Sequence, residues 1–251
     1  MKPSATQRNT LVVIPCYNES QRLDLAQIEE FVGGQSEVRL LFVDDGSSDA
    51  TAQILANLAQ RLPESVSWMQ LPVNSGKAEA VRQGVLVGLK EAPEFVGYWD
   101  ADFATPLYLV GDFRRMLLTD SNLLGVLGSR VQRLGARIER NPFRHYAGRV
   151  FASLASLVLG IAVYDTQCGA KMFRAGPEMR AAFAQSFDSS WIFDVEVLAR
   201  LKRMLGAKIL ATRLYEYPLP EWRDVAGSKL STTRGAGAFL ELWKIFRKYR
   251  R

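Results

Sequence analysis

The chain has 251 residues, 48% of them hydrophobic and 23% charged, so it can bury a large core and is expected to be globular. Its formal net charge of +6 is concentrated in residues 130–149 and 234–251, each with six lysines or arginines against one glutamate. Such basic segments suit a polyanion or an anionic membrane surface, or form a solvated face.

The start of the chain and its cysteines indicate a cytoplasmic protein. No N-terminal stretch combines a basic start, an apolar core and a small-residue cleavage site, so secretion is not expected. The two cysteines, Cys16 and Cys168, cannot form a disulfide framework, and no Cys/His spacing suggests zinc. We expect both to remain reduced thiols.

The first half of the chain alternates strand-like and helix-like segments. Four runs predict strands: TLVVIPCYN (10–18), SEVRLLFVDD (36–45), VSWMQLP (66–72) and FVGYWDAD (95–102). A capped helix start follows the second run, and the helical stretch KAEAVRQGVLVGLKEA (77–92) separates the last two. This order predicts a mostly parallel α/β sheet flanked by helices, with ligands beyond the carboxyl ends of its strands.

Polar clusters fall at those predicted strand ends, and the last of them contains Asp100 and Asp102. At positions i and i+2 of an ending strand, both carboxylates can point to one side and form a clamp for Mg²⁺ or Mn²⁺. A metal held by so few carboxylates keeps open positions for substrate phosphates. The alternative is an ordinary turn with helix-capping aspartates.

The series VVIPCYNES, VDDGSSDAT, NSGKAEAVRQGV and WDADFATP, in this order, resembles the nucleotide-sugar-binding half of glycosyltransferase family 2, which has a GT-A type fold. The resemblance implies that Asp100 and Asp102 hold the nucleoside and the metal, and that Gly76 lets Lys77 approach the ribose or diphosphate. It also implies a uracil and ribose pocket lined by Pro15, Tyr17, Asn18, Glu19 and Asp44. Each piece could instead be an ordinary turn, N-cap or loop.

The second half resembles the polyprenyl-phosphate branch of that family, most closely the dolichyl-phosphate β-glucosyltransferases. The motifs that carry this resemblance are DTQCG (165–169), W-x-F-D-x-E (191–196) and GSKL (227–230). It implies an inverting, metal-dependent transfer of a hexose, glucose above all, from a UDP-sugar to a polyprenyl phosphate. We expect a single domain, 1–251, with a donor-binding half, 8–128, and an acceptor-binding, membrane-interface half, 129–251. The membrane anchors of many relatives are not seen in this sequence.

An acceptor phosphate is largely a dianion at pH 7, so its chemistry requires alignment and charge neutralisation rather than a strong base. Arg130 is expected to bind this phosphate, with Arg133, Arg137 and Arg140 as further candidates or solvent-exposed residues. Asp165 and Gln167 would lie near the anomeric carbon, order the arginines, or make structural hydrogen bonds.

Three further residues have two possible roles each. Trp191 would contact the sugar or acceptor, or belong to the core. Asp194 would orient sugar hydroxyls or cap the helix. His145, the one histidine, is expected to be interfacial or structural.

Two segments predict amphipathic helices at a membrane interface. Residues 150–164 are apolar but too short to span a bilayer, and their flank is basic. Near the C-terminus, Phe239, Leu242, Trp243 and Phe246 share one helical face and basic residues another. Either segment could instead pack on the protein's own core. The cytoplasmic face of an anionic membrane is the expected location.

Other classes fit less well. A family 2 transferase with a carbohydrate hydroxyl acceptor would need a carboxylate base, and a GDP-mannose-dependent polyprenyl-phosphate mannosyltransferase would differ in few pocket residues. A nucleotidyltransferase usually has a glycine-rich loop after its first strand, which IPCYNES is not. No nucleic-acid-binding motif is visible, so no nucleic-acid partner is expected. The oligomeric state is not indicated.

Overall fold

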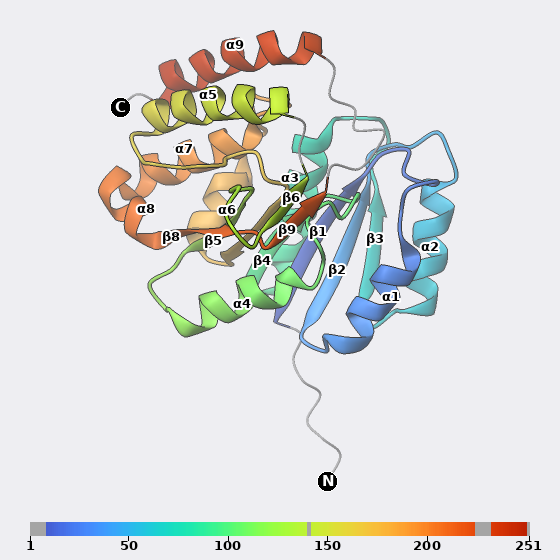
Figure 1. Ribbon diagram of the computed structural model, residues 1–251. Helices are drawn as coiled ribbons and strands as arrows, with labels where there is room; N and C mark the ends of the chain where they lie inside the picture. Colours follow the sequence, from blue (N-terminus) through green and yellow to red (C-terminus); the bar gives the residue numbers. More distant parts are fainter. Residues whose placement is uncertain (1–8, 140–141, 224–231, 250–251) are drawn as a thin grey trace.

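The computed structural model describes residues 9–139, 142–223 and 232–249 and contains a seven-stranded sheet (Figure 1). The strands, in spatial order, are β3 (Val66–Gln70), β2 (Val38–Asp44), β1 (Thr10–Cys16), β4 (Phe95–Trp99), β7 (Ala170–Arg174), β5 (Gly125–Ser129) and β8 (Leu214–Pro218). Only β7 runs antiparallel to its neighbours, β4 and β5. The predicted mostly parallel sheet is therefore confirmed.

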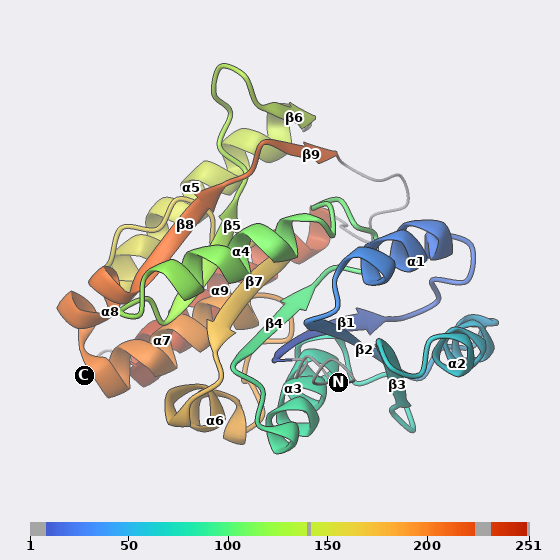
Figure 2. The same cartoon turned by 90° about the horizontal axis from the view of Figure 1, so that it is seen from below.

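Helices cover both faces of this sheet (Figure 2). One face packs against α1 (Leu25–Gly34), α2 (Thr51–Arg61) and α4 (Leu109–Thr119), and the other against α3 (Lys77–Gly88), α6 (Pro177–Ala184) and α7 (Phe193–Leu205). Side chains of β1 alternate between the two cores: Val12 and Ile14 join the first, Leu11 and Val13 the second. Because both faces are buried, the central strands β1 and β4 are almost entirely apolar.

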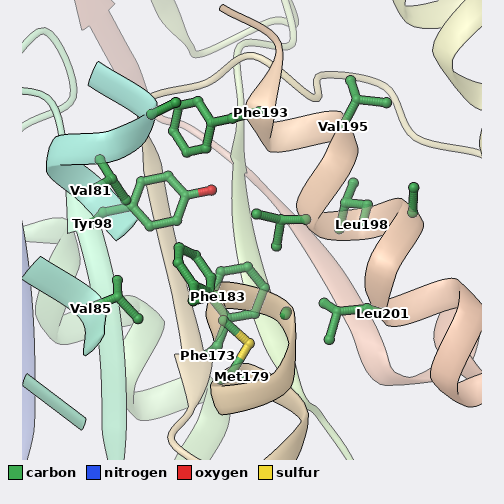
Figure 3. Close-up of a cluster of buried hydrophobic side chains, with 14 of the residues drawn as sticks. Val81, Val85, Tyr98, Phe173, Met179, Phe183, Phe193, Val195, Leu198 and Leu201 are labelled. Carbon is green, nitrogen blue, oxygen red and sulfur yellow. The ribbon is translucent and has the colours of Figure 1, made fainter. Parts of the chain in front are cut away.

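The second core fixes the start of α7 against the sheet (Figure 3). The rings of Tyr98 in β4 and Phe193 at the start of α7 lie 5.7 Å apart between centroids, and Phe173 in β7 lies 6.4 Å from Tyr98. Phe183 of α6 is buried in the same cluster. The first turn of α7 therefore lies close to the end of β4 and the start of β7, next to the site residues.

Two long helices form an outer layer over α7: α5 (Pro142–Leu159) and α9 (Thr232–Tyr249) (Figure 1). Both have one face on the core and another in solvent, so the alternative of packing on the core holds for one face, and contact of the other face with a membrane stays a prediction. In α9, Leu242 and Ile245 are buried, while Phe239, Leu240 and Trp243 are exposed. The burial of Leu242 supports the alternative in which α9 packs on the protein's own core, whereas Phe239 and Trp243 of the predicted apolar face are exposed.

The remaining elements connect these layers. They are the 3₁₀ turn η1 (Leu89–Glu91), α8 (Ala207–Arg213), and a separate parallel ribbon of β6 (Arg137–Glu139) and β9 (Glu221–Arg223). No described helix is both long enough and apolar enough to cross a membrane.

Candidate active site

The first predicted donor segment, after β1, is joined to the loop after β2. Pro15 is the partly exposed residue near the end of β1, and Tyr17 and Asn18 follow it. Asn18 adopts a positive φ of 52°. Its side-chain oxygen accepts a hydrogen bond from the Ser48 backbone amide (2.9 Å), and its backbone amide donates to the Ser47 hydroxyl (2.9 Å). The two loops thus form one rigid edge at the carboxyl ends of β1 and β2.

Asp44 and Glu19 lie deeper than a substrate-facing position suggests. The Asp44 side chain is buried and accepts hydrogen bonds from the Ser47 hydroxyl and from the Gln70 amide nitrogen (2.9 Å). A contact between Asp44 and a nucleobase therefore requires Ser47 or Gln70 to move. Glu19 is also buried and forms an ion pair with Arg22 (3.1 Å).

Asp45, in the VDDGSSDAT segment after β2, holds the loop that precedes Lys77. Its carboxylate accepts hydrogen bonds from the backbone amides of Ser75 (2.7 Å) and Gly76 (2.8 Å). Burial raises the pKa of Asp45 and these two bonds oppose the rise. Gly76 has a φ of 90°, which favours glycine, and α3 begins directly after it at Lys77. Asp45 thereby fixes the position from which Lys77 extends.

Lys77 and the aspartate pair come together at the end of β4. The Lys77 ammonium lies 2.5 Å from Asp100 Oδ1. Burial disfavours its charge, but Asp100, Asp194 and Asp102 outweigh that effect and raise the pKa of Lys77. Burial, followed by Asp100, raises the pKa of Asp102. These mutual effects place both carboxylates and the ammonium within electrostatic reach of one another.

The geometry of the pair differs from the predicted one. The strand ends at Trp99, and Asp100 and Asp102 lie in the turn that follows, where Asp102 accepts a bond from the Ala104 amide (3.1 Å). Strand alternation therefore does not bring them together; the turn does. Arg22 Nη2 lies 4.0 Å from Asp102 Oδ2, a neighbour that no motif in the sequence indicates.

The carboxylates of Asp100 and Asp102 are suitable ligands for a divalent metal ion. Asp100 Oδ1 already accepts a cationic partner at 2.5 Å, and carboxylate oxygens are the ligands that Mg²⁺ and Mn²⁺ prefer. Within the described part of the chain, no group of three or more His, Cys, Asp or Glu side chains is arranged to hold a metal. A metal here would thus be held by two carboxylates and would keep positions for substrate oxygens.

Gly169 of the DTQCG segment lies directly against Asp100. The Asp100 amide donates to the Gly169 carbonyl (3.0 Å), and a Cβ at Gly169 would lie 1.9 Å from Asp100 Oδ2. Only a glycine leaves room for this carboxylate. The segment from the second half of the chain therefore shapes the aspartate site of the first half.

Arg130 and Asp165 form a two-pronged ion pair at the end of β5. The distances are 2.6 Å from Nε to Oδ2 and 2.8 Å from Nη2 to Oδ1. Burial opposes the charge of Arg130, but Asp165 above all, with a smaller contribution from Asp100, raises its pKa. The Nη1 atom has no hydrogen-bond partner among the described residues. Asp165 thus holds Arg130 rigidly near Asp100, and the Nη1 group of the guanidinium is available to a ligand.

Residues of β8 and β9 support this pair. Glu216 accepts bonds from the amides of Tyr164 (2.7 Å) and Asp165 (2.8 Å), and the Arg130 guanidinium lies 5.2 Å from the centre of the Trp222 ring. Gln167 is partly exposed and its backbone amide donates to Asp165 Oδ1 (3.1 Å). The contacts of Asp165 fit two of its predicted roles, ordering an arginine and making structural hydrogen bonds, and a place near the anomeric carbon stays a prediction.

Trp191 and Asp194 lie toward the core. Trp191 is partly buried against the second core cluster, in the segment before α7. The Asp194 carboxylate is buried, pairs with Lys171 (2.6 Å) and accepts from the Tyr98 hydroxyl (2.7 Å). Its predicted contact with sugar hydroxyls stays a prediction. Lys171 could not be identified from the sequence as part of this site, because the partner of a lysine within an apolar strand is known only from the fold.

The structure describes two of the other predicted acceptor arginines. Arg133 and Arg137 are exposed, in the loop after β5 and in β6. Arg140, the side chain of His145 and the GSKL segment lie outside the described residues.

Known proteins match both the fold and the sequence. Glucosyl-3-phosphoglycerate synthase of Mycobacterium tuberculosis, crystallised with Mn²⁺, UDP-glucose and phosphoglyceric acid, superposes with a TM-score of 0.67 over 96% of this chain and 80% of that chain, at 17% identity. The fold is thus of the GT-A type.

The sequence identifies the family. The model of glycosyl transferase family 2 matches residues 11–178, and the chain belongs to this family. A dolichyl-phosphate beta-glucosyltransferase of Trichomonas vaginalis is 31% identical over 93% of this chain and 72% of its own length. A dolichyl-phosphate beta-glucosyltransferase of Dictyostelium discoideum is 30% identical over 87% of this chain and 68% of its own length.

Proposed function

We propose that this chain transfers a hexose, glucose above all, from a UDP-sugar to a polyprenyl phosphate of the dolichyl type, with inversion at the anomeric carbon. The observation that carries the proposal is the position of Arg130, locked by Asp165 and within electrostatic reach of Asp100. A carboxylate pair for the departing diphosphate and a guanidinium for the incoming phosphate thus share one site. The relatives named above are dolichyl-phosphate beta-glucosyltransferases, which supports glucose and a dolichyl-type acceptor, and the structural neighbour crystallised with UDP-glucose supports the donor.

The reaction forms one bond and breaks one. A phosphate oxygen of the acceptor forms a bond to the anomeric carbon, and the bond from that carbon to UDP breaks, with the electron pair leaving on UDP. Because the acceptor phosphate is largely a dianion at pH 7, no proton has to be removed. This fits a site whose contacts orient an arginine rather than present a general base.

Individual residues of this chain would divide the work. Arg130 would bind and align the acceptor phosphate, and Lys77 would neutralise charge on the departing diphosphate. Asp100 and Asp102 would hold Mg²⁺ or Mn²⁺, which supplies further neutralisation of the leaving group. We assign the donor to residues 8–128 and the acceptor to residues 129–251 of a single domain.

We also propose that the chain attaches peripherally to an anionic membrane through an exposed apolar strip on α5 and α9. The strip comprises Tyr146, Val150, Leu154, Leu157, Phe239, Leu240 and Trp243. Phe151 and Phe239 link the two helices, with ring centres 6.4 Å apart, and Arg247 stacks over Trp243 (4.8 Å). A polyprenyl phosphate resides in a membrane, so this strip would bring the site to its acceptor.

A binding panel tests the donor assignment. Thermal unfolding in the presence of Mn²⁺ should shift upward with UDP and UDP-glucose and much less with GDP or GDP-mannose, because a ligand that binds the native state stabilises it. An equal or larger shift with the GDP compounds would overturn the uridine assignment.

A further inference from the structure

Two polar side chains meet at a single carboxylate oxygen of Asp194 beneath the candidate site. Lys171 Nζ lies 2.6 Å from Asp194 Oδ1, and the Tyr98 hydroxyl donates to the same oxygen (2.7 Å). The Lys171 and Asp194 side chains are 1% and 5% exposed. Tyr98 and Lys171 are cross-strand partners in β4 and β7, and Figure 3 shows the Tyr98 ring directed toward the start of α7. None of these groups has a step in the proposed reaction.

Lys171 has a second contact that leads toward the surface. Its ammonium donates to the Cys168 carbonyl (2.5 Å), so it holds the backbone immediately before Gly169. Gly169 in turn accepts from the Asp100 amide and makes room for the Asp100 carboxylate. A continuous series of contacts therefore runs from Asp194 through Lys171 and the 168–169 backbone to Asp100.

Packing alone does not account for a lysine at this position. The surrounding side chains are largely aromatic and aliphatic, and a buried ion pair often contributes less stability than apolar residues of the same volume. The ammonium offers what an apolar side chain cannot, a directed hydrogen bond to a backbone carbonyl. Asp194 pairs with that ammonium and orients it, and it also lies within electrostatic reach of Lys77.

We propose that Lys171 is a positioning residue: through the Cys168 carbonyl it fixes the turn against which Asp100 rests, and so sets the affinity of the aspartate pair for its metal. This inference rests on the proposed function, because it assumes that Asp100 and Asp102 hold a divalent ion. It assigns no substrate contact to Lys171. Loss of Lys171 should therefore weaken metal binding rather than binding of the acceptor.

The experiment measures Mn²⁺ binding directly, from the loss of the free-Mn²⁺ electron paramagnetic resonance signal at saturating UDP, together with thermal unfolding. Lys171→Met should weaken Mn²⁺ binding about tenfold, in line with the effect of removing groups that orient a metal ligand. Arg200→Met is the matched control. Arg200 is also a buried cation that pairs with a carboxylate, Glu196 (2.8 Å), and donates to backbone carbonyls, but those carbonyls belong to residues 182–186. It should lower thermal stability yet leave Mn²⁺ affinity within about twofold.

A double variant separates positioning from stability. In Lys171→Met/Asp194→Leu no unpaired carboxylate is left behind, so folding and thermal stability should recover relative to Lys171→Met. Mn²⁺ affinity should stay about tenfold weak, since the Cys168 carbonyl still lacks its donor. The inference is overturned if the double variant regains Mn²⁺ affinity together with stability, or if Lys171→Met binds Mn²⁺ as the wild type does. Failure of the wild type to bind Mn²⁺ with UDP would instead overturn the proposed function, and the inference with it.

Discussion

Arg130 and Asp165 form a two-pronged ion pair whose guanidinium lies within electrostatic reach of Asp100. The pair comes from β5 and from the loop before β7, whereas Asp100 follows β4. Because β7 lies between β4 and β5, the DTQCG segment that precedes it contacts both groups. The donor and acceptor halves of the proposed site thus meet at one segment of the chain.

The first prediction separates those halves. Arg130→Ala should leave UDP binding in the presence of Mn²⁺ nearly unchanged. It should lower kcat/KM for the lipid acceptor by a factor that corresponds to about 2 to 4 kcal/mol, the cost of removing one electrostatic stabiliser. Asp100→Asn should weaken UDP binding itself. Calorimetric UDP titrations and acceptor kinetics distinguish the two. Arg133→Ala, an exposed arginine in the following loop, is the control and should cost far less. Weakened UDP binding in Arg130→Ala would assign this arginine to the donor.

Gly169→Ala is predicted to abolish most of the metal-dependent UDP binding while the fold stays intact. The added Cβ would lie 1.9 Å from Asp100 Oδ2, so the carboxylate must move, and moving it is easier than moving the backbone of β7. Isothermal titration with UDP and Mn²⁺ measures the loss, and circular dichroism checks the fold. Gly237→Ala, at a helical glycine whose added Cβ meets nothing within 4 Å, is the control. Unchanged UDP affinity in Gly169→Ala would show that Asp100 is not a donor-site ligand.

Membrane attachment is tested on the apolar strip of α5 and α9. Trp243→Glu should reduce co-sedimentation with anionic vesicles several-fold, because it places a negative charge among exposed apolar and basic side chains. High salt should reduce binding of the wild type as well. Ile209→Glu makes a similar change at an exposed residue of α8, away from the strip, and should bind as the wild type does. Equal sedimentation of wild type and Trp243→Glu would exclude the strip as the docking surface.

Hydrogen bonds to Asp49, next to the proposed donor site, predict a specific dependence of thermal stability on pH. Although desolvation opposes it, hydrogen bonds from Ser20 and Thr51 lower the pKa of Asp49 from 3.8 to about 2. A lowered pKa in the folded state means that the carboxylate contributes stability above its ordinary pKa and loses it as the pH falls toward 2. Asp49→Asn should therefore lower the melting temperature at pH 6, with a difference from wild type that shrinks between pH 4 and pH 2. A difference that stays constant over this range would show that Asp49 forms no such bonds.

The sequence predicted most of what local pattern controls. The strands β1 to β4, the helix from Lys77 and the polar segments at the strand ends could be read from apolar runs and turn residues. Contacts between distant residues could not. The W-x-F-D-x-E pattern did not reveal that Asp194 pairs with Lys171, or that Glu196 accepts from Tyr249 of α9, since these partners are fixed by how β7 and α9 pack. For the same reason the sequence left open whether the apolar face of α9, with Leu242, packs on the core.

The most direct test of the proposed function is transfer of labelled glucose from UDP-glucose to a short polyprenyl phosphate in detergent, followed by extraction of the lipid. The proposed function predicts label in the lipid phase as a β-linked, acid-labile sugar phosphate, and this labelling should require Mn²⁺ or Mg²⁺. Asp102→Asn should reduce it at least about a hundredfold without unfolding the protein. Label that stays in water as free glucose, or that passes to a carbohydrate hydroxyl but never to the lipid phosphate, would contradict it.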